Sequence, residues 1–181
     1  MRRLRASLLI ALSLAYPLVV YSCLGRFEPR WLALFLRLLA ALRAVATRER
    51  TWLWAALGTG ALALWAFLDN AALPLKLYPV LVNLALLLAF GLSLRFGPPL
   101  VERLARLREP ELPARAVAYT RRVTQAWCVF FLCNGALALA TSLWASDAVW
   151  ALYNGAIAYG LIGLMFAAEW LVRQRVMARD G

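Results

Sequence analysis

Residues 76–94 form an apolar run that is long enough to cross a lipid bilayer as one helix. At 1.5 Å per residue the run reaches about 28 Å, close to the roughly 30 Å thickness of the hydrocarbon core. It also contains Pro79 and Asn83. A membrane helix tolerates a proline where neighbouring groups bond the backbone carbonyl that loses its partner, and an asparagine where they bond its side-chain amide. The run therefore predicts a transmembrane helix that packs against other helices.

Composition extends this prediction to the whole chain. Hydrophobic residues make up 64% of the 181 positions, whereas a soluble domain holds roughly 45–50%. The apolar residues occur in long runs, so lipid must be the solvent for most of the surface. The sequence predicts an all-α, polytopic membrane helix bundle of about six transmembrane helices in a single domain over 1–181. The predicted spans are 6–25, 31–46, 52–68, 76–94, 124–144 and 148–172.

The positions of the cations predict how this bundle is oriented. The net charge of +11 would suggest nucleic-acid binding in a soluble protein, but here the cations lie between apolar runs, and no nucleic-acid partner is expected. With both termini in the cytoplasm, 16 of the 20 Lys and Arg residues fall on the cytoplasmic side, as the positive-inside rule requires. The cytoplasmic segments are then 1–5, 43–51, 95–123 and 173–181.

Two segments allow an alternative interpretation. Residues 31–46 reach only about 24 Å as a helix and contain Arg37, so they fit either a short span or a helix lying at the interface. Charge counting favours the span. If this segment did not span, the orientation of every later segment would be inverted, and the arginines would then fit the positive-inside rule badly. The segment 1–25 resembles a secretory signal, but the later apolar runs favour an uncleaved first helix.

The residue types argue against catalysis and against a bound metal. The chain has no His, the commonest general base and metal ligand, and its three Cys show no metal-ligand spacing. It contains no nucleophile elbow, P-loop or dinucleotide fingerprint. We therefore expect neither an enzymatic activity nor a cofactor.

Polar residues at membrane depth are the candidate functional residues. Amides inside a bundle either hydrogen-bond across helices and fix their packing, or line a cavity that holds a headgroup or substrate. The sequence leaves both roles open. The candidate polar cavity consists of Asn83, Asn134, Asn154, Tyr153 and Tyr78.

Cations at the membrane surface are the candidate contacts to lipids or partner proteins. The segment 95–123 is the one long polar loop, and its arginines would face anionic headgroups, each adding about 1 kcal/mol. Arg37 would either snorkel to the interface or bind a lipid phosphate. Glu169 lies four residues before Arg173, and this spacing predicts a local ion pair. The candidate contacts are Arg37, Arg95, Arg121 and Arg122.

Several motifs in the second half resemble known membrane-protein families. The segments PLVER at 99–103, RRVTQAWCVFFLCNG at 121–135 and WASDAVW at 144–150 resemble the intracellular septation protein A family. Three further motifs are similar to an uncharacterised membrane-protein family encoded in aryl-polyene and fatty-acid-like biosynthesis clusters. These are the Tyr78-Pro79 pair with Asn83, REPELP at 108–113 and ALYNG at 151–155. Both resemblances imply a small bacterial inner-membrane protein, and no catalytic residue carries over from either family.

Two functions follow as expectations. The first is a non-enzymatic inner-membrane accessory protein of cell-envelope or polyene-lipid assembly, which acts by helix packing and partner docking through the 95–123 loop. The second is a small lipid or polyene transporter or flippase component. A weak repeat, Tyr16-Pro17 against Tyr78-Pro79, would place related helices in two inverted halves, as in many transporters.

Overall fold

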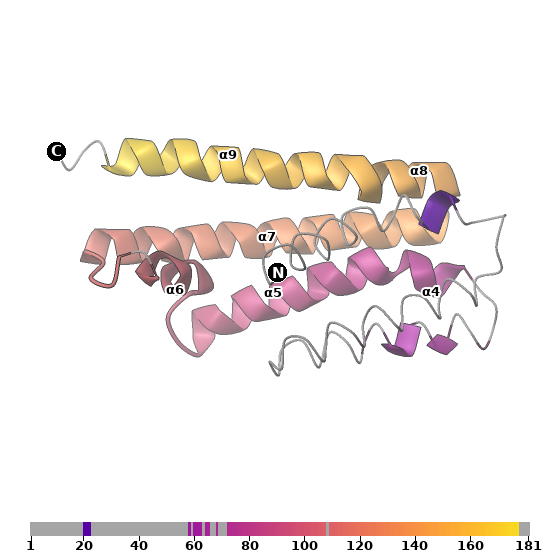
Figure 1. The fold of residues 1–181 in the computed structure, drawn as a ribbon, viewed down its shortest axis with the longest axis horizontal. Helices are drawn as coiled ribbons and strands as arrows, with labels where there is room; N and C mark the ends of the chain where they lie inside the picture. Colours follow the sequence, from indigo (N-terminus) through magenta and orange to yellow (C-terminus); the bar gives the residue numbers. More distant parts are fainter. Residues whose placement is uncertain are drawn as a thin grey trace, which may run out of the picture. The chain divides into compact units, whose positions relative to one another are not determined.

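The computed structural model describes residues 20–22, 58, 60–62, 64–65, 68, 72–107 and 109–177 (Figure 1). Within these ranges every regular element is helical, and no strand occurs. Most of the predicted spans 6–25, 31–46 and 52–68, together with Arg37, lie outside the described residues. The named elements are α4 (Leu73–Lys76), α5 (Tyr78–Arg95), α6 (Leu100–Arg106), α7 (Ala114–Trp144), α8 (Asp147–Leu152), a π-helical segment (Tyr153–Ile157) and α9 (Ala158–Met177).

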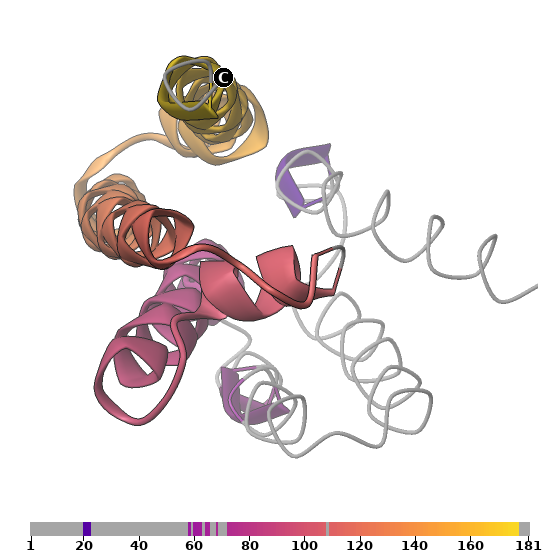
Figure 2. The same ribbon diagram turned by 90° about the vertical axis from the view of Figure 1, so that its left-hand side faces the viewer.

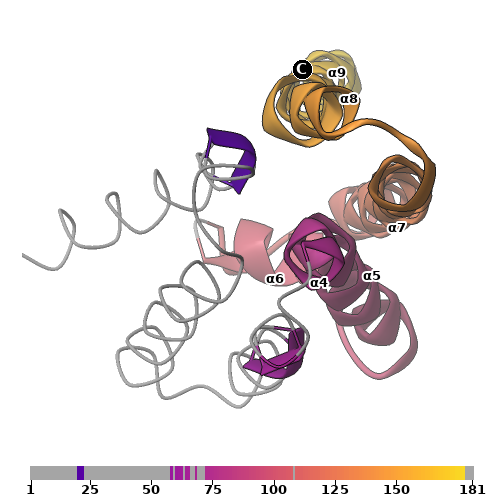
Figure 3. The same cartoon turned by 90° about the vertical axis from the view of Figure 1, so that its right-hand side faces the viewer.

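Three helical stretches are long and apolar enough to cross a membrane: Leu73–Arg95, Ala114–Trp144 and Asp147–Arg175. They contain the predicted spans 76–94, 124–144 and 148–172, and the protein is thus an all-α membrane protein of the helix-bundle class. Ala145 and Ser146 separate the second stretch from the third. Figure 3 views the helices from the end where α7 stops and α8 begins.

The side chains of α7 show why this bundle needs lipid as its solvent. Its outward-facing residues include Val129 and Leu132, which are 62% and 60% exposed. Its buried residues recur every three or four positions, so they form one stripe along the helix. That stripe mixes polar with apolar side chains, the reverse of a soluble amphipathic helix. Its members include Thr120, Thr124, Trp127, Phe131, Asn134, Ala138 and Ser142.

The polar loop predicted at 95–123 is more helical than expected. Residues Leu100–Arg106 form the short helix α6. However, α7 begins at Ala114, well before the predicted span at 124–144. Its 31 residues reach about 46 Å, against a hydrocarbon core of roughly 30 Å. The helix is therefore longer than the hydrocarbon core is thick. Its first turns carry Arg115, Arg121 and Arg122 as helical residues.

The described residues fall into two compact units, which we describe separately. One unit contains the residues up to Leu81 together with 137–161. The other contains 82–136 together with the residues from Ile162 onward. The helices α5, α7 and α9 contribute residues to both units.

In the first unit, a helix break at Pro79 determines which side chains meet. Proline has no N–H and crowds the preceding turn, so it interrupts the helical hydrogen bonds there. The helix is interrupted at Leu77, between α4 and α5. The carbonyl of Lys76 then accepts hydrogen bonds from Ser142 Oγ at 2.9 Å and from Trp150 Nε1 at 3.2 Å. A backbone carbonyl at the interruption between α4 and α5 is thereby satisfied by neighbouring helices, as a membrane interior requires.

Two further contacts complete this unit. The ammonium of Lys76 forms an ion pair with the carboxylate of Asp147. Asn154, in the π-helical segment, donates to the Trp150 carbonyl at 2.9 Å and to Thr141 Oγ1 at 3.2 Å. These polar contacts hold α4, α7 and α8 together.

In the second unit, α5 and α7 meet at a pair of amides. Asn134 Nδ2 donates to Asn83 Oδ1 at 3.0 Å, and both residues are buried. Gly135 makes this approach possible, because a Cβ added there would lie 3.1 Å from the Cβ of Asn83. Small residues at such crossings let membrane helices approach closely enough to hydrogen-bond.

Candidate functional site

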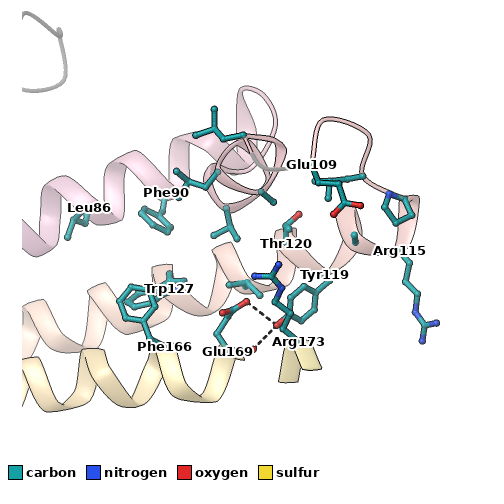
Figure 4. Close-up of a pocket in the computed structure, with 18 of the residues that line it drawn as sticks. Leu86, Phe90, Glu109, Arg115, Tyr119, Thr120, Trp127, Phe166, Glu169 and Arg173 are labelled. Atoms are coloured by element: carbon teal, nitrogen blue, oxygen red, sulfur yellow. Dashed lines mark hydrogen bonds between the residues drawn. The ribbon is translucent and has the colours of Figure 1, made fainter. Parts of the chain in front are cut away.

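The second unit contains a pocket with a volume of about 760 Å³, which lies within the roughly 300–1,000 Å³ typical of small-molecule sites. Residues of α5, α6, the 107–113 segment, α7 and α9 line it. We refer to it as the α6 pocket, because α6 forms one wall. Figure 4 shows most of its lining side chains.

An aromatic cluster forms the deep end of the α6 pocket. Trp127 and Phe131 are one helical turn apart on α7 and only 7% and 6% exposed. Phe90 of α5 lies 5.2 Å from Phe131, and Phe166 of α9 lies 4.9 Å from Trp127, measured between ring centroids. These packed rings form an apolar floor shared by three helices. Leu86 and Ile162 extend it.

The wall formed by α6 is anchored at its first residue. Ser93, near the end of α5, accepts a hydrogen bond from the Leu100 N–H at 2.9 Å and donates to the Phe90 carbonyl at 2.6 Å. The Arg103 side chain donates to the Pro98 carbonyl in the connecting segment at 2.9 Å. These bonds fix how α6 leaves α5 (Figure 2). Val101 and Leu104 can then line the pocket.

The last turn of α6 carries Arg106, a partly exposed cation that forms an ion pair with the buried carboxylate of Glu102. Glu102 is 5% exposed, and its Oε1 accepts from the Arg106 Nε and Nη2 atoms at 2.9 and 2.8 Å. Arg106 also donates to the Pro110 carbonyl at 3.0 Å, which ties the helix to the following segment. A buried carboxylate requires such a partner. The pair therefore orients α6 and the 107–113 segment together.

The opposite end of the α6 pocket is polar. Tyr119 Oη donates to the Glu169 backbone carbonyl at 3.1 Å and to Glu169 Oε1 at 3.4 Å, which joins α7 to α9 (Figure 4). The predicted ion pair between Glu169 and Arg173 is wrong, since no such pair forms although both residues are described. Glu169 instead meets Tyr119, a residue 50 positions away. The polar lining residues are Glu109, Arg115, Tyr119, Thr120, Glu169 and Arg173.

The five residues predicted to form a polar cavity do not line the α6 pocket. The structure brings Asn83 and Asn134 together in one unit and places Asn154, Tyr153 and Tyr78 in the other. The three amides hydrogen-bond to other protein groups, an arrangement that favours the packing role. Tyr78 and Tyr153 also make contacts within the chain.

The predicted surface cations Arg95, Arg121 and Arg122 are exposed in the structure. The guanidinium of Arg95 lies 5.7 Å from the centroid of the Phe96 ring, and Arg121 donates to the Leu94 carbonyl at 3.4 Å. The Arg121 contact places this side chain beside the end of α5. Within the described ranges, no three His, Cys, Asp or Glu side chains are grouped to hold a metal ion.

Sequence reasoning missed the α6 pocket as a site. The signal was present in the apolar spacing of Leu100, Leu104 and Leu107 and in the aromatic pair Trp127 and Phe131. The sequence does not show that these side chains converge with Phe166 and Tyr119. The chain matches no protein-family model, and no curated protein or solved structure is similar enough to count as a match.

Proposed function

We propose that this protein is a non-enzymatic inner-membrane accessory protein of cell-envelope or polyene-lipid assembly that holds one acyl or polyene chain in the α6 pocket. The observation that carries this proposal is the polarity of the pocket. Its Trp127 end is aromatic and apolar, and its Tyr119 end is polar. Such a gradient suits an amphiphile, because each part of the molecule finds matching surroundings.

The dimensions of the pocket also suit a membrane chain. Eleven residues of α7 separate Thr120 from Phe131, which corresponds to about 16 Å along the helix. This distance is about half of the roughly 30 Å hydrocarbon core. From its polar end to its aromatic end, the pocket thus extends over about the depth of one leaflet.

The surface near the pocket supports partner docking as part of the same function. Arg121 and Arg122 are exposed on the first turns of α7, which also carry the polar lining residues Tyr119 and Thr120. With the topology inferred from charge, this surface faces the cytoplasm, where soluble lipid-assembly enzymes work. The accessory protein would hold the chain while a cytoplasmic partner contacts its polar end. The resemblance to envelope and polyene-cluster families agrees with this role.

The transporter alternative receives less support. A flippase needs polar groups that can accompany a headgroup through the bilayer, and the candidates were the amides Asn83, Asn134 and Asn154. The amides of Asn83 and Asn134 are hydrogen-bonded to each other, and that of Asn154 to Thr141 and Trp150. A lipid-holding accessory uses the observed pocket without breaking these bonds.

A binding experiment tests the proposal. The full chain, purified in nanodiscs, is titrated with a fatty acid that carries a fluorescent conjugated polyene. Leu104→Trp fills the pocket from a side chain that is 56% exposed on α6, so its folding cost is small. The matched control is Leu132→Trp, at a position 60% exposed on α7 and not lining the pocket.

We expect saturable binding by the wild type and by Leu132→Trp, and a loss of about tenfold or more in affinity for Leu104→Trp. Trp127→Ala should weaken binding as well, provided that circular dichroism shows an intact fold. Equal affinity of wild type and Leu104→Trp for the probe would refute the proposed pocket.

A further inference from the structure

At the polar end of the α6 pocket, the Arg173 guanidinium has no hydrogen bond or ion pair to any residue that the structure describes. Four charged side chains line this end: Glu109, Arg115, Glu169 and Arg173. Arg115 contacts other protein groups, and its side chain extends away from Tyr119 (Figure 4). The Arg173 guanidinium, in contrast, makes no hydrogen bond or ion pair with any residue that the structure describes.

Arg173 does not pair with Glu169, because Glu169 contacts Tyr119 instead. Glu169 is one turn before Arg173 on α9 and would be its nearest anion. Its carboxylate and its backbone carbonyl both accept from Tyr119 Oη instead. Figure 4 shows the Arg173 side chain extending from α9 toward α7, beside Tyr119 and Glu169. A planar guanidinium there presents paired N–H donors to the pocket.

We infer that the occupant of the α6 pocket is a single acyl chain ending in a carboxylate, and that Arg173 binds this carboxylate. The inference rests on the proposed lipid-binding function and names its ligand class. At roughly 30 Å³ for each water-sized group, 760 Å³ accommodates about 25 non-hydrogen atoms. This is enough to hold one long chain with a small head.

The surrounding charges favour a carboxylate over a phosphate. Glu109 and Glu169 line the same end and offset the charges of Arg115 and Arg173. A phosphate monoester, with close to two negative charges near pH 7, would be repelled by both carboxylates. A carboxylate adds a single charge and fits the guanidinium with two parallel hydrogen bonds.

Competition in nanodiscs of neutral phosphatidylcholine tests this inference. The fluorescent polyene acid is displaced by hexadecanoic acid, hexadecanol or hexadecyl phosphate, at a pH that keeps the acid ionised. The variant is Arg173→Gln, which removes the charge at an exposed position and so preserves the fold. The matched control is Arg175→Gln, also exposed on α9 but not lining the pocket.

We expect hexadecanoic acid to displace the probe best. Arg173→Gln should weaken its binding about tenfold or more, since it removes a charge-assisted hydrogen bond. Hexadecanol binding should not change, and Arg175→Gln should match the wild type for both ligands. Arg173→Lys keeps the charge but loses the paired N–H donors of the guanidinium, so it should retain part of the affinity.

Three outcomes would overturn the inference while leaving the lipid-holding function intact. Hexadecanol could bind the wild type as tightly as the acid, hexadecyl phosphate could bind more tightly, or Arg173→Gln could weaken acid and alcohol equally. If neither the acid nor the alcohol binds the wild type, the proposed function itself fails.

Discussion

The pair formed by Asn83 and Asn134 gives the sharpest test of whether the membrane amides pack the helices or serve a ligand. The perturbation is Asn83→Ala, Asn134→Ala and the double variant. Alanine retains the Cβ that lies close to Gly135 and removes the amide alone. Each single substitution leaves the partner amide without a 3.0 Å hydrogen bond at a site less than 10% exposed.

The expected coupling free energy depends on the burial of the pair and on the hydrogen bonds that the amides make in the unfolded state. A buried polar group left without its partner costs about 1–3 kcal/mol. In membranes the coupling measured by double-mutant cycles is smaller, about 0.6 kcal/mol on average with a maximum of about 1.7, because the unfolded helices also find partners in lipid. Since this bond joins two buried amides at a close helix crossing, we expect a coupling of about 1 kcal/mol.

Reversible unfolding in mixed micelles, followed by far-ultraviolet circular dichroism, provides the four free energies. The control cycle combines Asn83→Ala with Asn154→Ala, because Asn154 uses its amide on Trp150 and Thr141. Its two costs should add, within the usual error of about 0.3–0.5 kcal/mol. A coupling between Asn83 and Asn134 inside that error would refute the packing argument.

The same variants separate the two roles by function. Because neither asparagine lines the α6 pocket, the folded fraction of each variant should bind the fluorescent polyene acid with wild-type affinity. Loss of binding by Asn83→Ala, at unchanged stability, would instead support a ligand cavity lined by these amides.

Three further predictions concern stability and topology. Trp150→Phe keeps an aromatic side chain but removes the indole N–H that donates to the Lys76 carbonyl. The lost hydrogen bond alone should make unfolding in micelles easier by about 0.5–1.5 kcal/mol, and the smaller ring adds to this cost at a fully buried site; unchanged stability would contradict this. Gly135→Val should cost about 1–3 kcal/mol in the same assay, because its side chain meets Asn83; a stable, unshifted variant would show a looser crossing. Reporter fusions should read cytoplasmic at Arg108 and periplasmic at Ser146, and the opposite pattern would invert the topology.

The later spans could be predicted from the sequence because their signal is local. A membrane helix satisfies its own backbone hydrogen bonds, so length and apolar composition are enough to locate it. The runs 76–94, 124–144 and 148–172 were found in this way, and their helices appear in the structure. The early start of α7 at Ala114 was missed, because its first turns carry polar residues that resemble a loop.

The partners of the polar residues depended on contacts that local sequence does not encode. Spacing along α9 paired Glu169 with Arg173, but the folded chain offers Glu169 the hydroxyl of Tyr119 from another helix. The sequence left open whether Asn83 and Asn134 pack helices or line a cavity, and only their meeting beside Gly135 shows that they hydrogen-bond to each other. A hydrogen bond across helices depends on crossing geometry, which neither helix specifies alone.

The sequence by itself determined that this chain is a helical membrane protein, because the transfer of long apolar runs from water into lipid is strongly favourable. Only the tertiary structure decided where a ligand can lie. The α6 pocket needs Phe90, Leu104, Trp127 and Phe166 from four helices. It also needs Tyr119 to engage Glu169, while Arg173 forms no hydrogen bond or ion pair with the residues that the structure describes. These residues are far apart in the chain, and packing alone brings them together.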